Sequence, residues 1–141
     1  MAELPVKLRV HESIFVPMAK WCMLLAGNYR CVQQSEMRTI KDAVHSDLEE
    51  TQEVYQGVSE LCISLGAAPS DMVPFEKYAS AAESLISPSS AARALAAGAP
   101  NIERVDRLVQ SIAANKGLSL TAVDKTVALV DSWIEKNQEK A

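Results

Sequence analysis

The chain has 141 residues, of which 48% are hydrophobic and 23% are charged, and its net charge is −4. This composition is typical of one globular domain that can form a core, and it argues against a disordered chain. The acidic balance also argues against a nucleic-acid-binding protein, because phosphate recognition depends on clustered Lys and Arg.

The termini, cysteines and histidines exclude several further classes. No signal peptide is recognisable near Met1, and no apolar run reaches the length of a membrane span. The three cysteines form no CxxC pair, which favours small hydrophobic residues in a reducing cytoplasm over disulfides. His11 and His45 have no Cys or carboxylate at ligand spacing, so we expect no metal site. We therefore expect a cytoplasmic protein that binds neither membrane nor nucleic acid.

Residues 1–12 are predicted to be extended. Leu4, Val6, Leu8 and Val10 alternate with other residues, which is the period of a half-buried strand over 4–10. The rest of the chain offers no second strand to pair with it. Such a strand needs a partner for its backbone groups, so it pairs with a symmetry mate or belongs to a sheet outside this chain.

Residues 13–141 are predicted to form an all-α domain of about six helices. The first helix runs from Ser13 to Arg30. The second is the longest, from about Ser35 to Leu65, with a bend marked by Thr51 and an end at Gly66.

The later helices are predicted from their caps and glycines. The third begins at Asp71 or Pro74 and ends near Ile86. Ser89 or Ser90 caps a short helix that ends at Gly98. The remaining boundaries are a cap at Asn101 for a helix over 102–116, an end at Gly117, a capping box at Thr121 and Asp124, and a solvated tail EKNQEKA.

Two polar residues interrupt the first helix. Lys20 and Asn28 are eight residues apart, so on a regular α-helix they differ by about 80° in azimuth after two turns. They therefore share a broad face, with Leu24 between them. A lysine and an amide aimed at one place suit a substrate oxygen, because one donates charge and a proton and the other a hydrogen bond. The residue pattern alone leaves open a surface lysine and an asparagine at a fraying helix end.

A combination of short motifs points to a family. Ser90 opens an Ala-rich helix, Gly98 ends it, and Glu103 stands at the start of the next helix. Together with Lys20 and Asn28, this arrangement resembles the C-terminal, substrate-side domain of the ketopantoate reductase family, which is similar to the C-terminal domain of 6-phosphogluconate dehydrogenase. The similarity runs from Leu4 to Trp133. In this comparison residues 1–12 resemble the end of a nucleotide-binding domain.

The resemblance implies site residues and a reaction. Lys20 and Glu103 match catalytic positions, while Asn28 and Ser90 match substrate-binding positions. Independently of the resemblance, Arg93 lies one turn after Ser90 and would add positive charge for an acid substrate. In the family, NADPH reduces a small 2-oxo acid. No dinucleotide-binding motif occurs in this chain, so its cofactor-binding residues are unknown and NADP is expected on a nucleotide-binding domain in cis or in trans.

Two positions depart from the family pattern, and a second interpretation exists. Leu24 stands at an asparagine position, and Ile102 occupies the glutamate position in ungapped register. The alternative is a non-catalytic scaffold derived from this domain, with the helix 35–65 as a dimer interface. A homodimer is expected in either case. Convergence of Lys20, Asn28 and Ser90 on one pocket would favour the enzyme, and their dispersal would favour the scaffold.

Overall fold

The computed structural model describes residues 18 and 20–140. The strand predicted over 4–10 and the start of the first helix lie outside the described residues. Within them the fold is all-α, as predicted, and the only β-type pairing is an isolated bridge between Val32 and Met37. None of the helices in this part of the chain is long and apolar enough to cross a membrane.

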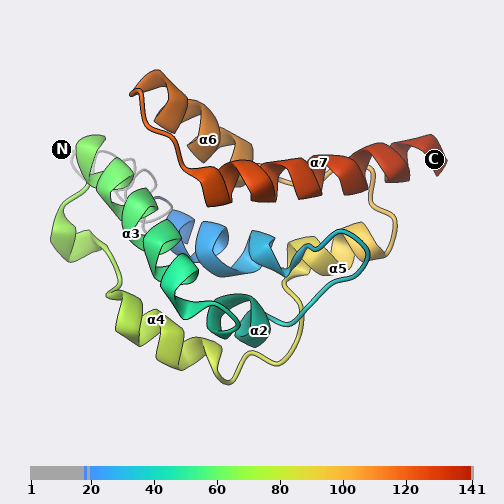
Figure 1. Ribbon diagram of the computed structural model, residues 1–141, viewed down its shortest axis with the longest axis horizontal. Coiled ribbons are helices and arrows are strands. Elements are labelled where there is room, and N and C mark those ends of the chain that lie inside the picture. The colour runs from blue at the N-terminus through green and yellow to red at the C-terminus, as the bar shows by residue number, and fades with distance from the viewer. Residues whose placement is uncertain (1–17, 19, 141) are drawn as a thin grey trace, which may run out of the picture.

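A central helical segment organises the domain (Figure 1). Residues 20–23 are α-helical and continue into the π-helix η1 (Leu24–Asn28) and the 3₁₀-helix η2 (Tyr29–Cys31). Around η1 pack α2 (Ile40–His45), α3 (Leu48–Ser64), α5 (Ser90–Ala96) and α6 (Val105–Asn115). The two remaining α-helices are α4 (Phe75–Ala82), against α2 and α3, and α7 (Thr121–Lys140), which packs on α6, α3 and α5. A 3₁₀ turn, η3 (Pro69–Asp71), precedes α4.

The core is made by apolar residues from every layer. The fully buried side chains include Cys22, Leu25, Val44, Val58, Leu61, Leu95, Val109, Val123 and Val130. Removal of this apolar surface from water, at about 25 cal/mol per Å², is the main force that holds the helices together.

The prediction of one long helix over 35–65 is wrong, because Asp47 separates α2 from α3. The Asp47 side chain accepts a hydrogen bond from the backbone N–H of Glu50, so it is an N-cap inside the predicted helix. Thr51, where a bend was predicted, donates its hydroxyl proton to the Val44 carbonyl at 2.8 Å. That bond satisfies a carbonyl near the end of α2, so the break is stabilised on both sides.

The predicted end of the third helix is corrected by contacts from distant residues. The third helix ends at Ala82 rather than near Ile86, because the carbonyls of Leu85 and Ser87 accept the N–H groups of Lys41 and Ile40 at the start of α2. These contacts draw residues 85–87 away from helical geometry and cap α2 instead.

The helix predicted over 102–116 begins at Val105 instead, and Asn101 is not its cap. The Tyr29 hydroxyl donates to the carbonyl of Glu103 at 2.6 Å and accepts from the Val105 N–H at 3.0 Å. A side chain from the central segment therefore replaces the local cap.

The last helix starts at Thr121 as predicted and continues to Lys140 through the tail, whose residues 135, 136 and 138–140 are exposed as expected. Asn137 is buried there, and its amide nitrogen donates to the carbonyls of Leu95 and Ala99. These are carbonyls at the end of α5, so the last turns of α7 cap another helix. The glycine ends are confirmed, since Gly66, Gly98 and Gly117 all have positive φ.

Candidate functional site

The structure brings Asn28 and Ser90 together. Both line a pocket of about 330 Å³, with Arg93 as a further member. The polar side chains share this pocket with the apolar side chains of Ile40, Leu85, Ile86 and Pro88. In small-ligand sites a few polar groups beside apolar ones fix the orientation of the ligand, and this pocket offers both kinds of side chain.

A hydrogen bond of Ser89 sets the distance between these two elements. The Ser89 hydroxyl donates to the Asn28 carbonyl at 2.7 Å and accepts the Ala92 N–H at 3.2 Å. Ser89 is therefore both the N-cap of α5 and its link to η1, which leaves Ser90 exposed as the first residue of the helix. The Ser90 hydroxyl accepts only from Arg93 Nη2, at 3.3 Å. It is thus available to a ligand.

Lys20 lies on the same helical segment as Asn28 but is not among the residues that line the pocket, so only two of the three residues expected to converge do so. Its side chain is exposed. The π-helical turn between the two residues needs more residues per turn than an α-helix, so their azimuths differ by less than about 80°. The two residues therefore share a face more closely than a regular helix would allow, at different heights along it.

Glu103 is exposed and also lies outside the lining of the pocket. Its backbone is nevertheless fixed to the residue after Asn28 by the Tyr29 hydroxyl. Burial raises the pKa of Tyr29, so the phenol stays protonated and keeps donating this bond at neutral pH. Ile102, at the family's glutamate position, is partly buried and packs against the core. Leu24 also packs against the core.

The central segment also carries a buried charge that the sequence interpretation missed. The Arg30 side chain is 6% exposed and donates to the Ala26 carbonyl and to the Thr51 hydroxyl. The helical pattern predicts Arg30 only as the end of the first helix. The sequence does contain a signal for this buried charge, since Arg30 is flanked by Tyr29, Cys31 and Val32. An arginine within such an apolar run is expected to be buried only if other groups pair with it.

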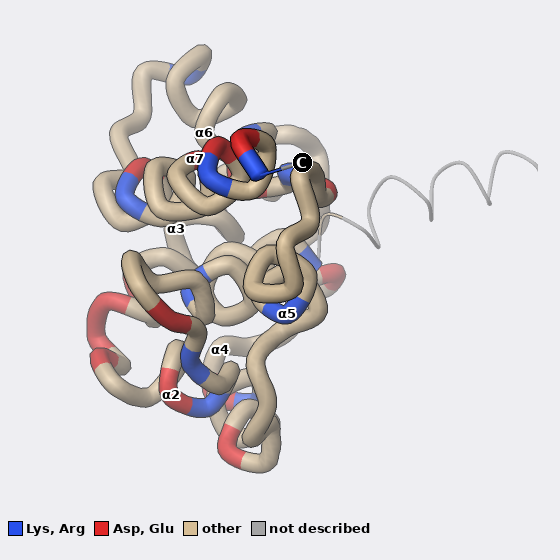
Figure 2. Tube along the Cα trace, turned by 90° about the vertical axis from the view of Figure 1, so that its right-hand side faces the viewer, with Lys and Arg blue, Asp and Glu red and all other residues tan. Residues whose placement is uncertain are grey.

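A second charged network lies at the start of α6. Arg104 donates to both carboxylate oxygens of the fully buried Asp106 at 2.9 Å and to Asp131 of α7 at 2.7 Å. Its role is to hold α6 to α7. Elsewhere basic and acidic residues are interspersed over the helices rather than gathered in a basic stripe (Figure 2). Among residues 18 and 20–140, no group of three or more His, Cys, Asp or Glu is placed to hold a metal ion.

Comparison of the chain with protein-family models, with curated protein sequences and with solved structures gave no match. A proposal of function therefore rests on the resemblance of the short motifs described above and on the geometry of the residues.

Proposed function

We propose that this chain is the helical substrate-binding domain of a ketopantoate-reductase-like, NAD(P)-dependent oxidoreductase that reduces a small 2-oxo acid. The observation that supports it best is the pocket shared by Asn28 and Ser90, which come from separate elements and match two substrate-binding positions of the family. Arg93 at the same pocket supplies the charge that a carboxylate requires. The apolar lining residues suit a short aliphatic side chain of the acid.

Each residue would then have a distinct task. The Ser90 hydroxyl and the Arg93 guanidinium would bind the carboxylate, and the Asn28 amide would bind the 2-oxo oxygen or a neighbouring hydroxyl. Lys20, exposed on the face of Asn28, would give a proton to the reduced oxygen. Glu103 would orient Lys20 or the substrate. The side chains of Lys20 and Glu103 would both have to move toward the substrate when the nucleotide-binding domain completes the site.

The chain's own residues do not suit the cofactor. Its described part is helical and contains no strand-turn-helix unit with a glycine-rich phosphate loop. NADP, which supplies the hydride, would therefore be held by a nucleotide-binding domain in cis or in trans. Only substrate binding and proton donation are assigned to residues of this chain.

The test uses the native polypeptide, isolated from its source cells with an antibody against this domain. We expect it to contain or to co-purify with a nucleotide-binding domain, and to oxidise NADPH with at least one member of a panel of short-chain 2-oxo acids. Asn28→Ala and Ser90→Ala should each raise KM by about ten- to one-hundred-fold, since each removes a hydrogen bond to a charged or polarised group. Lys20→Ala should lower kcat.

Ser111→Ala is the matched control, because Ser111 is an exposed serine of α6 outside this pocket. Its kinetics should equal those of the unmodified protein. A native species with neither a nucleotide-binding partner nor NADPH-dependent activity would overturn the proposal. Such a species, if dimeric, would favour the scaffold.

A further inference from the structure

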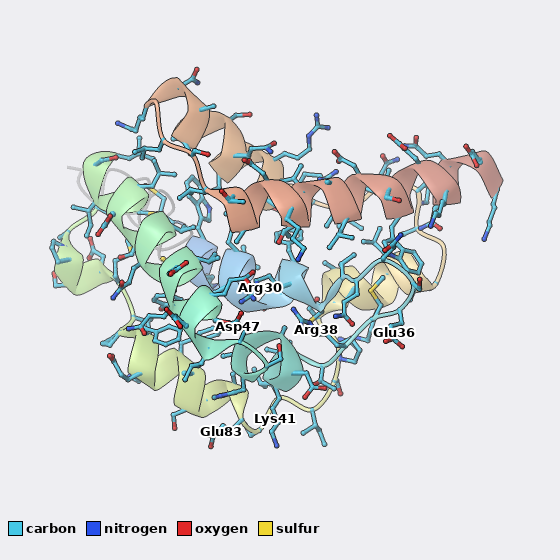
Figure 3. All side chains as sticks on the ribbon, in the orientation of Figure 1. Arg30, Glu36, Arg38, Lys41, Asp47 and Glu83 are labelled. Carbon is cyan, nitrogen blue, oxygen red and sulfur yellow. The ribbon has the colours of Figure 1, made fainter. Side chains whose placement is uncertain are left out.

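A second cavity, of about 310 Å³, lies between the loop after η2, the start of α3 and the first turns of α7. It shares no lining residue with the pocket of Asn28 and Ser90. Its charged lining residues are Arg30, Arg38 and Lys125 on the basic side, and Asp47 and Glu50 on the acidic side. Figure 3 shows Arg30, Arg38 and Asp47 gathered below α7. Three cations therefore meet two carboxylates in one cavity.

The buried cation, Arg30, is only weakly neutralised. One of its terminal nitrogens is taken by the Ala26 carbonyl and the Thr51 hydroxyl. The other lies 3.4 Å from the Glu50 carboxylate, whereas charge-assisted bonds are about 2.7–2.9 Å long. Burial lowers the pKa of Arg30, and the nearby positive charge of Arg38 lowers it further, against the pull of Glu50. An additional anion here would offset both the burial of the Arg30 charge and its repulsion by Arg38.

The other two cations have no counter-ion among residues 18 and 20–140. Arg38 is fixed by bonds from Nε to the Arg30 carbonyl at 2.9 Å and from Nη1 to the Ser46 hydroxyl at 3.0 Å. Lys125 reaches the cavity from α7. Within the described part of the chain, neither Arg38 nor Lys125 forms an ion pair. Asp47 is already engaged as the N-cap of α3.

We propose that this cavity binds the phosphoryl group of a small phosphate-bearing molecule, with Arg38 and Lys125 as its ligands and Arg30 behind them. The donors come from separate elements and so approach from several directions, which suits a tetrahedral group with several oxygens better than a planar carboxylate. The cavity begins at the N-terminus of the 17-residue helix α3, where Asp47 and Glu50 already offset the helix dipole, so the three cations supply the attraction for an anion. Its volume leaves room for an organic part beside the phosphoryl group.

The test is a titration of the full chain at low ionic strength with inorganic phosphate, followed by amide NMR. We expect saturable shifts at the amides around Arg38, Asp47 and Lys125, and weaker shifts or none with acetate. Glycerol 3-phosphate should produce the same shifts if the cavity accepts a phosphate ester. Absence of saturable shifts with phosphate, or equal binding of acetate, would overturn the assignment.

Charge variants make the test specific. Lys125→Gln should weaken phosphate binding about ten-fold, because it removes a charged donor. The Lys125 side chain is exposed and forms no hydrogen bond or ion pair within the described part of the chain, so the fold should not change. Glu50→Gln should strengthen binding by up to about five-fold, since it removes a competing carboxylate. Lys116→Gln, on an exposed lysine after α6, is the matched control and should change nothing. Equal losses for Lys125→Gln and Lys116→Gln would show general charge attraction and refute a defined site.

Discussion

Gly27 lies where the central segment meets α4, and the structure leaves no space for a side chain there. A Cβ atom at this position would overlap the hydroxyl oxygen of Tyr78 and would come within 3.2 Å of Tyr78 Cζ and 3.3 Å of Val44 Cγ2. The same Tyr78 hydroxyl donates to the Met23 carbonyl at 3.2 Å. Gly27→Ala therefore forces Tyr78 to move and to give up this bond.

The expected loss can be assembled from three effects. Overpacking a buried site costs about 1–3 kcal/mol, and the lost hydrogen bond costs about 1 kcal/mol. Replacing a helical glycine by alanine returns about 0.5–1 kcal/mol. We therefore expect Gly27→Ala to lower the free energy of unfolding by about 2 kcal/mol, as measured by urea denaturation followed by circular dichroism.

A double-mutant cycle with Tyr78→Phe tests the cause. Tyr78→Phe alone should cost about 1 kcal/mol, because the Met23 carbonyl loses its donor. In the double mutant the overlapping oxygen is gone and only the 3.2 Å and 3.3 Å approaches remain. The double mutant should thus be about 1–1.5 kcal/mol more stable than the sum of the single effects predicts.

Gly57→Ala is the control for the cycle. Its Cβ would meet only Leu120 Cδ2, at 3.2 Å, and the end of a leucine side chain can move. Because Gly57 lies inside α3, this substitution should be neutral or stabilising by up to about 1 kcal/mol. Additive losses in the Gly27 and Tyr78 cycle would refute the steric explanation.

Three further predictions follow from the buried polar groups. Asp106→Asn should lower the free energy of unfolding by about 3 kcal/mol, because it leaves Arg104 without its bidentate partner. Asp131→Asn should cost under about 1 kcal/mol, because the Asp131 side chain is 38% exposed. Equal losses for the two variants in chemical denaturation would contradict this explanation. Ser89→Ala should cost about 1–2 kcal/mol through the lost cap and the lost bond to η1, while Ser90→Ala should leave the melting temperature unchanged. Burial raises the pKa of Tyr55 from 10.0 to about 12, so the contribution of the protonated phenol to stability is complete below pH 10 and is lost as the pH rises toward 12. The free energy of unfolding, measured across this pH range, should therefore fall less steeply in Tyr55→Phe than in the unmodified protein.

Local residue patterns predicted some of the residues of the two pockets but not the pockets themselves. The positions of Asn28 and Ser90 could be singled out from local motifs, but their common pocket depends on the hydrogen bond between Ser89 and the Asn28 carbonyl. The cavity of Arg38 and Lys125 was not foreseen, because it joins a loop to a helix near the end of the chain. No periodicity within one element reports such a contact.

The sequence by itself determined the helical class and several helix ends. Apolar residues at three- and four-residue spacing, such as Val44, Val58 and Leu61, are buried in the core because a helix places them on one face. The glycines at 66, 98 and 117 end helices because only glycine adopts positive φ without strain. Both are local properties of the chain.

Tertiary structure alone decided two of the remaining boundaries. The start of α6 is fixed by the hydroxyl of Tyr29, and the end of α7 is held by bonds from Asn137 to carbonyls at the end of α5. In each case a backbone group at a helix end finds its partner on another element. Because such a partner is brought close only when the chain folds, no local pattern announces it.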